Sequence, residues 1–281
     1  MWDGRTLGDW AAELDGADAV VNLAGRTVSC RYTDTNLRQM MNSRVDSTRV
    51  VGEAISRAAR PPRVWLQMST ATIYADARSR PDDLPHDEAN GIIGGEEPDV
   101  PLYWEYSVRI ARRWEEAQAE AATPATRRVA LRTAMVMTPD RGGVFDYLSW
   151  MARLGLGGPV AGGRQYVSWI HGGDFVRVVE FLLERDDLDG PFIVAAPHPV
   201  PQGELMRTLR TAWGRRLGLP ATRLMAEAGA LALRTDTELL LKSRRVAPGR
   251  LLEGGFTFPH PTWDAAAANL VEEARTLRRR G

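Results

Sequence analysis

Short apolar runs alternate with longer amphipathic stretches along this chain. The apolar runs have the length and the branched side chains of buried strands, and they predict strands at 18–23, 64–69, 128–137 and 191–196. The stretches 33–59 and 103–121 place apolar residues at helical spacing and are predicted helices. The apolar stripe of the first helix consists of Val45, Val50, Val51, Ala54, Ile55 and Ala58.

Strands that alternate with helices predict an α/β protein. Near-continuous apolar strands are typical of a parallel sheet with helices on both faces. The sequence after Val200 is almost wholly helical in pattern, so we expect a first domain over 1–197 and a smaller, mostly helical C-terminal lobe over 198–281. Residues 138–170 are expected to leave the sheet and enter the second lobe.

Three polar segments follow predicted strands. They are 22–25, 69–74 and 132–135. Open parallel sheets bind ligands beyond the carboxyl ends of their strands. We therefore expect these segments to surround the functional site, together with the Gly-rich segment 162–174.

The composition narrows the classes of partner. Lys+Arg and Asp+Glu both total 36, so no bulk charge favours nucleic acid or a membrane surface. No apolar run approaches the ~20 residues of a membrane-spanning helix. Cys30 is the only cysteine, which favours a reducing cytoplasm. The four histidines lack metal-ligand spacing, so we predict no metal and expect a small-molecule substrate.

Several motifs resemble those of extended short-chain dehydrogenases/reductases. Ala17–Gly25 (ADAVVNLAG) is similar to their fourth-strand motif, and Ser69–Tyr74 (STATIY) to their fifth-strand motif. Gly162–His171 (GGRQYVSWIH), followed by Asp174, resembles an atypical branch, the NAD(P)-dependent epimerase-like proteins with a C-terminal domain of unknown function. Arg245–Phe256 (RVAPGRLLEGGF) resembles the signature of that domain. The resemblance implies a Rossmann-like fold and NADP or NAD as cofactor.

The main departure from this family lies at the start of the chain. Family members begin with a strand, a Gly-x-x-Gly-x-x-Gly turn and a helix, which hold the pyrophosphate of the cofactor. Here Met1-Trp2-Asp3 lies just after that portion of roughly 50 residues, so we expect an N-terminally truncated Rossmann-like domain that binds its cofactor weakly. The strand at 18–23 then has an apolar edge, which favours self-association.

The resemblance also implies catalytic positions. Thr70 occupies the place of a Ser or Thr that orients the substrate oxygen, although it could simply cap the turn. In the family a tyrosine transfers the proton, and a lysine four residues later lowers the pKa of that tyrosine. Tyr106 is the best match for the tyrosine, but Ile110 lies at the lysine position. Lys242 is the only lysine, and Tyr103 is the alternative tyrosine.

Arg109 offers a replacement for the missing lysine. It follows Tyr106 by three residues and therefore shares a helix face with it. A tyrosine that acts as a base near neutral pH needs about 4 kcal/mol of anion stabilisation, and a nearby cation is the usual source. The alternative is that Arg109 projects into solvent.

The cofactor side of the site is implied in the same way. Asn22, Ala24 and Gly25 match positions that line the phosphate and ribose of the cofactor. Arg44 could bind a phosphate or pair with a surface carboxylate. Ser69 and Thr133 are the remaining cofactor candidates.

The substrate side involves later segments. Met135 flanks the nicotinamide and substrate in the family scheme, and Gln165 lies in a segment that faces the substrate. Arg164 could bind a phosphate or carboxylate bidentately, or lie exposed on a turn. His171 is expected at a helix entry or in contact with substrate. Asp174 is predicted to cap a helix from Phe175 to Glu184.

Two functions remain open. The first is an NAD(P)-dependent epimerase or reductase that acts on a small carbonyl compound or a nucleotide-linked sugar. The second is a non-catalytic protein that binds a metabolite or the cofactor, which the broken tyrosine–lysine pair favours. The C-terminal residues Lys242, Arg244 and Arg245 are expected to hold the second lobe against the sheet, or to lie on a solvated helix face.

Overall fold

A parallel sheet of four strands forms the centre of the larger lobe. The computed structural model describes residues 2–79, 82–98, 100–101, 104–222, 225 and 238–280. The strands are β1 (Ala19–Asn22), β2 (Val64–Thr70), β3 (Arg127–Thr133) and β7 (Gly190–Val194), in the order β1-β2-β3-β7. All three pairings are parallel, as the apolar strands predicted.

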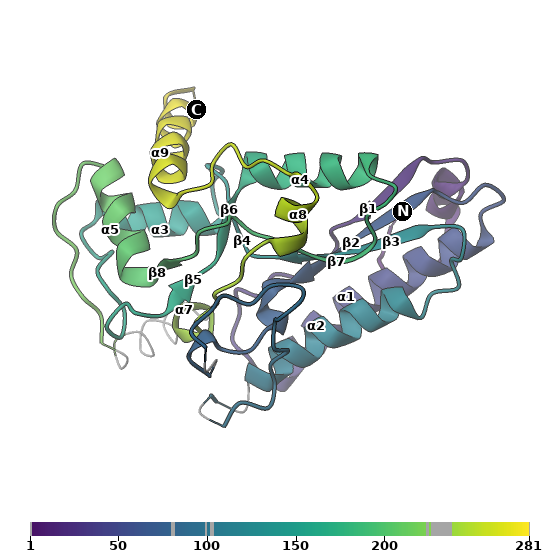
Figure 1. Cartoon of the computed structure of the whole chain (residues 1–281), viewed down its shortest axis with the longest axis horizontal. Coiled ribbons are helices and arrows are strands. Elements are labelled where there is room, and N and C mark those ends of the chain that lie inside the picture. Colours follow the sequence, from purple (N-terminus) through teal and green to yellow (C-terminus); the bar gives the residue numbers. More distant parts are fainter. Residues whose placement is uncertain are drawn as a thin grey trace.

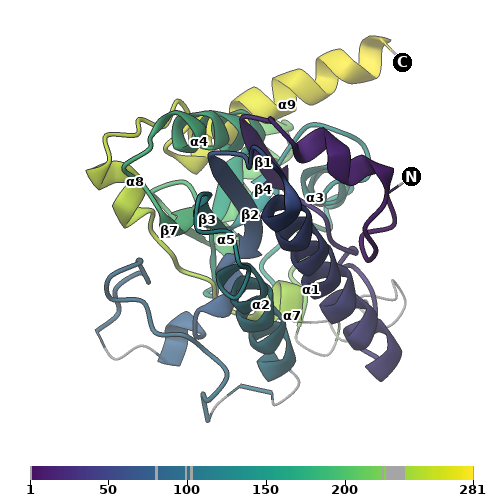
Figure 2. The same cartoon turned by 90° about the vertical axis from the view of Figure 1, so that its right-hand side faces the viewer.

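Helices cover both faces of this sheet (Figures 1 and 2). Helices α1 (Asp34–Arg57) and α2 (Trp104–Ala119) lie together on one face, and α4 (Gly172–Glu184) lies on the other. Successive side chains of a strand point to opposite faces. Trp65 of β2 therefore packs with Ile55 of α1, whereas Leu66 packs with Leu182 of α4. The predicted α/β fold is confirmed.

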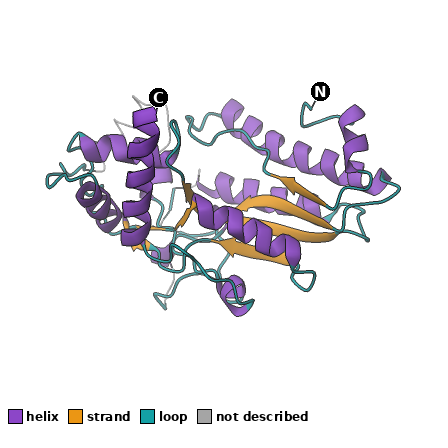
Figure 3. Cartoon of the chain, turned by 90° about the horizontal axis from the view of Figure 1, so that it is seen from above, coloured by secondary structure: helices purple, strands orange, loops and turns teal. Residues whose placement is uncertain are grey.

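The remaining strands are short and lie apart from the main sheet (Figure 3). β4 (Met135–Met137) pairs in parallel with β6 (Trp169–His171), and β5 (Tyr166–Val167) pairs antiparallel with β8 (Val200–Pro201). The other α-helices of the described residues are α3 (Val144–Arg153), α5 (Gln202–Ala212), α7 (Glu238–Leu241), α8 (Gly249–Glu253) and α9 (Trp263–Arg280). Short 3-10 helices in this part of the chain are η1 (Asp9–Leu14), η2 (Ala71–Ile73) and η3 (Ala77–Ser79). None of the described helices is both long and apolar enough to span a membrane.

The predicted strand 128–137 is wrong in one respect, because it is interrupted at Ala134. Ala134 N donates to Val194 O (3.0 Å), whereas Met135 N donates to Ser168 O (3.3 Å). The chain thus exchanges its neighbour β7 for the segment that leads into β6. As a result, β4 leaves the main sheet and enters the second lobe.

The prediction that Asp174 caps its helix is also wrong. Helix α4 begins at Gly172, and His171 is the N-cap residue, because Gly173 N donates to His171 Nδ1 (3.0 Å). The Asp174 carboxylate instead accepts a hydrogen bond from His260 N (3.0 Å). The expectation that His171 stands at a helix entry is confirmed.

Candidate functional site

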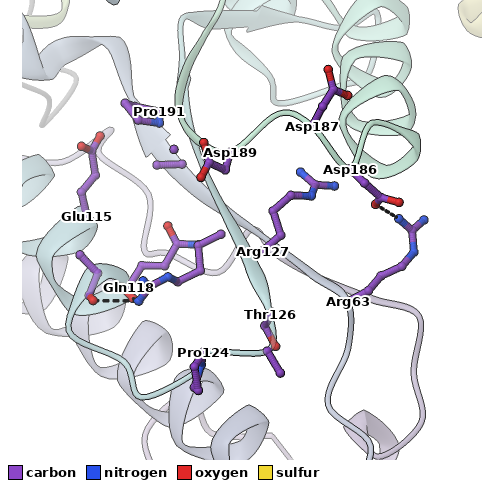
Figure 4. Close-up of a pocket in the computed structure, with 15 residues that line it drawn as sticks. Arg63, Glu115, Gln118, Pro124, Thr126, Arg127, Asp186, Asp187, Asp189 and Pro191 are labelled. Carbon is purple, nitrogen blue, oxygen red and sulfur yellow. Dashed lines mark hydrogen bonds and ion pairs between the residues drawn. The ribbon is translucent and has the colours of Figure 1, made fainter.

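Two of the cavities lie at opposite ends of the main sheet. The larger has a volume of about 860 Å³ and lies where β2, β3 and β7 begin (Figure 4). Its walls carry charges of both signs, including the exposed ion pair of Arg63 with Asp186 (2.7 Å). Because parallel sheets bind ligands at the carboxyl ends of their strands, the smaller cavity at the other end is the candidate site.

The smaller cavity lies beyond the end of β2, between α1 and α2. Its volume is about 100 Å³, below the roughly 300–1,000 Å³ of typical ligand pockets. It can therefore hold only one end of a dinucleotide. Its lining residues come from separate parts of the chain: Val28, Tyr32, Met40, Arg44, Thr70, Thr72, Ser107, Ile110, Trp114, Glu238 and Arg244.

The two hydroxyl residues at the end of β2 have different surroundings. Thr70 lines the cavity, and its Oγ1 accepts a hydrogen bond from Thr72 N (3.2 Å) at the start of η2. The Ser69 hydroxyl donates to Glu115 Oε1 (2.6 Å) on α2. Of these two residues, Thr70, for which a catalytic role is predicted, lines the cavity. Ser69 instead links β2 to α2 through its hydrogen bond with Glu115.

The predicted pair Tyr106 and Arg109 does come together on α2. The Arg109 guanidinium carbon lies 4.5 Å from the centre of the Tyr106 ring. Within the described part of the chain, neither residue lines the cavity. Tyr103 lies outside the described residues. The residues of α2 that do line the cavity are Ser107, Ile110 and Trp114.

Arg44 extends from α1 into the cavity wall and is half-buried. Its Nη1 donates to Met40 O (3.1 Å), and its guanidinium carbon lies 4.9 Å from the centre of a Trp114 ring. Burial lowers the pKa of Arg44, while nearby Tyr32 and Cys30 act in the opposite direction. A guanidinium in this position can bind the phosphate or carboxylate of a ligand.

The turn after β1 lies against Arg44. Asn22 Nδ2 donates to Gln67 Oε1 (2.9 Å), and Asn22 Oδ1 accepts from Ala24 N (3.0 Å). A side-chain carbon added at Gly25 would lie 3.4 Å from Arg44 Cζ. Gly25 therefore packs against Arg44, and Asn22 fixes the turn that carries Gly25. Of the predicted residues Asn22, Ala24, Gly25 and Arg44, Arg44 lines the cavity.

Charged residues of the C-terminal segment close the cavity. Glu238, at the start of α7, is fully buried and accepts a hydrogen bond from Ser107 Oγ (2.5 Å). Its Oε1 lies 3.6 Å from Arg244 Nη2 and 3.8 Å from Lys242 Nζ. Both cations also reach Thr72, since Arg244 Nε donates to Thr72 Oγ1 (3.2 Å) and Lys242 Nζ to Thr72 O (3.1 Å). Figure 1 shows α7 near the start of α2.

Sequence reasoning missed this contribution to the cavity. The contacts of Lys242 and Arg244 with Thr72 agree with the expectation that the segment holds the second lobe against the sheet. Burial lowers the pKa of Lys242, and Glu238 opposes that shift. Lys242 and Arg244 directly precede the family signature Arg245–Phe256, and this position was the one available signal.

The other predicted residues lie away from the cavity wall. Thr133 is buried, and its hydroxyl donates to the backbone of its own strand, to Leu131 O (3.0 Å). Met135 packs against the core of the second lobe. Arg164 is exposed, whereas Gln165 is buried and ties its turn to α7 through a hydrogen bond from Nε2 to Leu240 O (3.0 Å).

His171 belongs to a polar cluster that joins α4 to α9. Its Nε2 lies 3.0 Å from Asn269 Oδ1, and its ring stacks on His260 with 3.9 Å between ring centres. Ligand atoms of His171, Asp174 and His260 lie within 4.8 Å of one another, close enough for a metal ion. However, both ring nitrogens of His171 already have hydrogen-bond partners, Asn269 Oδ1 at Nε2 and Gly173 N at Nδ1. The arrangement is therefore that of a joint between helices.

Comparison with known families agrees with this architecture. Residues 3–195 match the model of the NAD dependent epimerase/dehydratase family. The chain belongs to this family. Residues 224–270 match a domain of unknown function, DUF1731. The resemblance to epimerase-like proteins with such a C-terminal domain is thus confirmed.

Individual relatives extend over most of the chain. The human epimerase family protein SDR39U1 is 29% identical over 264 residues, which cover 93% of this chain and 84% of the human protein. The epimerase family protein YfhF of Bacillus subtilis is 24% identical over 268 residues, which cover 94% of this chain and 82% of that protein.

Two solved structures show the shared fold. The structure of human SDR39U1 (isoform 2) with NADPH has a TM-score of 0.79 at 27% identity, and the match covers 94% of this chain and 85% of that one. The nucleoside-diphosphate sugar epimerase from Corynebacterium glutamicum has a TM-score of 0.70 at 22% identity, with 99% of this chain and 53% of that chain covered. The Rossmann-like fold is therefore shared.

Proposed function

We propose that the chain is an NAD(P)-dependent epimerase or reductase that acts on a small carbonyl compound or a nucleotide-linked sugar. The cavity at the end of β2 carries this proposal, because Thr70 and Arg44 both line it. The human relative whose structure contains NADPH supports the same cofactor class. The single cysteine supports a cytoplasmic setting.

The chemistry of the lining residues fits one end of such a cofactor. When bound, the nicotinamide would supply hydride transfer. Arg44 would bind a phosphate of the cofactor, and the turn of Asn22, Ala24 and Gly25 would hold Arg44 in place. Thr70 would orient the substrate oxygen through its hydroxyl.

Proton transfer is assigned to Tyr106 in this proposal. The Arg109 guanidinium carbon lies 4.5 Å from the centre of its ring, so Arg109 would hold the ring in place through a cation–π contact. Tyr106 is adjacent to Ser107, which lines the cavity, so a small rotation of the side chain or a bridging water is needed for contact with a substrate. General acid–base help of this kind accelerates reactions roughly 10²–10⁴-fold.

A second candidate is a non-catalytic protein that binds a metabolite or the cofactor. The cavity-facing side of α2 favours this candidate. It presents Ser107 and Ile110 to the cavity, and it lacks the tyrosine–lysine pair of the family because Lys242 is the only lysine of the chain. The enzyme and the cofactor-binding form of the second candidate both need the cavity to bind a nicotinamide cofactor. They differ in whether the bound cofactor is turned over.

Fluorescence titration with NADPH and NADH tests the shared claim. Trp114 lies beside Arg44 in the cavity wall, so cofactor binding should quench tryptophan emission in a saturable manner. Arg44→Ala should raise the Kd by roughly 10-fold or more, because a hydrogen bond to a charged group contributes about 1.5–3 kcal/mol. Arg49→Ala, an exposed position of the same helix, is the control and should leave the Kd unchanged.

The outcomes separate the candidates. Absence of saturable quenching by either nucleotide would refute the enzyme and the cofactor-binding form of the second candidate. Saturable binding followed by loss of NADPH absorbance with a panel of carbonyl compounds supports the enzyme. Binding without turnover across that panel supports the second candidate.

A further inference from the structure

The cavity carries more positive charge than its own side chains balance. In the described part of the chain, its charged lining residues are Arg44, Glu238 and Arg244. Glu238 is shared between two cations, because its Oε1 lies 3.6 Å from Arg244 Nη2 and 3.8 Å from the buried Lys242 Nζ. Among the described lining residues, two guanidinium groups therefore have only this one carboxylate between them. Charge that is removed from water without a counter-ion is unfavourable, so an anionic ligand would complete the cavity.

Arg244 is held in an orientation suited to such an anion. Its Nε donates to Thr72 Oγ1 (3.2 Å), and its Nη1 donates to the carbonyl oxygen of Glu238 (3.3 Å). Its side chain is 15% exposed, so most of its hydration is already lost. Its Nη2 faces Glu238 Oε1 at 3.6 Å. Among the described residues, these three contacts leave one N–H group on each of Nη1 and Nη2, and such a pair forms a planar fork that matches a carboxylate or phosphate.

The position of Arg244 indicates that the anion is part of the substrate. Arg244 is bound to Thr72, which lies two residues after Thr70, the hydroxyl proposed to orient the substrate oxygen. An anion on Arg244 therefore lies beside the reacting group. A carboxylate with a carbonyl or hydroxyl group on the neighbouring carbon would place its charge on Arg244 and its oxygen at Thr70.

We propose that Arg244 binds the substrate's carboxylate, and that the substrate is a small acid with a carbonyl or hydroxyl group beside that carboxylate. The inference rests on the proposed function and narrows its substrate class, because it favours the small carbonyl compound over the nucleotide-linked sugar. Arg244 is then a specificity-determining residue that the C-terminal domain contributes to the sheet domain.

Binding of small probes to the full chain tests this proposal without knowledge of the substrate. Tryptophan fluorescence is titrated with oxamate, whose carboxylate adjoins an amide carbonyl, with neutral oxamide, and with inorganic phosphate. Wild type should bind oxamate in a saturable manner and should not bind oxamide. Arg244→Ala should raise the Kd for oxamate by roughly 10-fold or more. Arg244→Lys keeps the positive charge but loses the planar pair of N–H donors. Its Kd for oxamate should therefore lie between those of wild type and Arg244→Ala.

The neighbouring Arg245 provides a matched control. It stacks on Tyr166 (4.3 Å) and pairs with Asp83 (2.7 Å), away from the cavity, so Arg245→Ala should bind oxamate like wild type. If Arg244→Ala does not fold, the difference between Arg244→Lys and wild type decides the question. Equal affinity of these two proteins for oxamate would overturn the proposal.

Two further results would also overturn it. Binding of oxamide as tight as that of oxamate would show that charge is not recognised. Inorganic phosphate binding more tightly than oxamate would indicate a phosphate subsite instead. NADPH is titrated in the same preparations, so a chain that binds oxamate through Arg244 but not NADPH would refute the proposed function and leave the carboxylate site standing.

Discussion

At the scale of residues, one nearly buried ion pair holds the ends of β2 and β3 against α2. Arg132 Nε and Nη2 donate to the two carboxylate oxygens of Glu115 (2.9 and 2.8 Å), and Arg132 Nη1 donates to Tyr74 Oη (2.9 Å). Burial raises the pKa of Tyr74 and Arg132 opposes that shift, so Tyr74 stays neutral near physiological pH. Because Ser69 donates to the same carboxylate, the network fixes the strand just before Thr70.

Removal of the carboxylate charge should therefore destabilise the protein strongly. Glu115→Gln leaves Arg132 largely buried without its counter-ion, which typically costs about 3–5 kcal/mol. Glu116→Gln changes an exposed ion pair on the same helix and should alter the free energy of unfolding by less than about 1 kcal/mol. Urea denaturation measures both. Equal effects of the two substitutions would contradict this description of the pair.

At the scale of elements, α9 is attached to the start of α4 through His171, whose Nε2 lies 3.0 Å from Asn269 Oδ1 of α9 and whose ring stacks on His260 just before α9. Burial lowers the pKa of His171 and the neighbouring His260 acts in the same direction, while Asn269, Asp174 and Glu273 oppose them. Protonation would place a hydrogen on His171 Nδ1, which now accepts from Gly173 N and caps α4. The joint between α4 and α9 therefore requires a neutral His171.

This predicts a specific loss of stability in acid. The folded-state pKa of His171 lies below its unfolded value of about 6.5. Its contribution is therefore complete above that value and is lost as the pH falls toward the folded-state pKa. The Tm of wild type should fall more between about pH 8 and about pH 5 than the Tm of His171→Gln. His198→Gln, an exposed histidine, is the control and should retain the wild-type decline.

The elements of the sheet domain were predictable because their signals are local. β2 is a short, mostly apolar run, and α1 has its apolar stripe within one segment. The interruption at Ala134 was not predictable, since it depends on a hydrogen bond to Ser168 O, far along the chain. The cap of α4 was missed because a histidine ring nitrogen takes the place of a carboxylate.

Some residues of the candidate site were likewise predictable from local motifs, and others were not because they reach the site only through folding. Thr70 and Arg44 were predicted from motifs of the sheet domain, and both line the cavity. Glu238 and Arg244 were not assigned to it, because only folding brings the C-terminal segment to η2. The domain limits at 197 and 198, and the roles of Tyr106 and Arg109, stay predictions.

At the scale of the whole molecule, the outer edge of β1 carries exposed apolar side chains. Val21 and Leu23 are 39% and 50% exposed, and among the described residues β1 pairs only with β2. An uncovered strand edge of this kind favours pairing with a second copy. We therefore predict that two copies of this chain associate through the edge of β1.

A charge placed on that edge should weaken the association. Val21→Lys should shift the sedimentation velocity profile toward the monomer at every protein concentration, because an edge lysine opposes strand pairing. Val176→Lys, on the exposed side of α4, adds the same charge elsewhere and should leave the profile unchanged. A wild-type protein that sediments as a monomer across the concentration range would contradict the prediction.

The most direct test is to locate bound NADPH on the molecule by methyl NMR of the full chain. If the proposed cofactor site is correct, the nicotinamide protons should contact the methyl groups of Thr70, Thr72 and Ile110, which line the small cavity at the end of β2. Contacts instead with Ala125 and Ala130, in the larger cavity at the opposite end of the sheet, would contradict it.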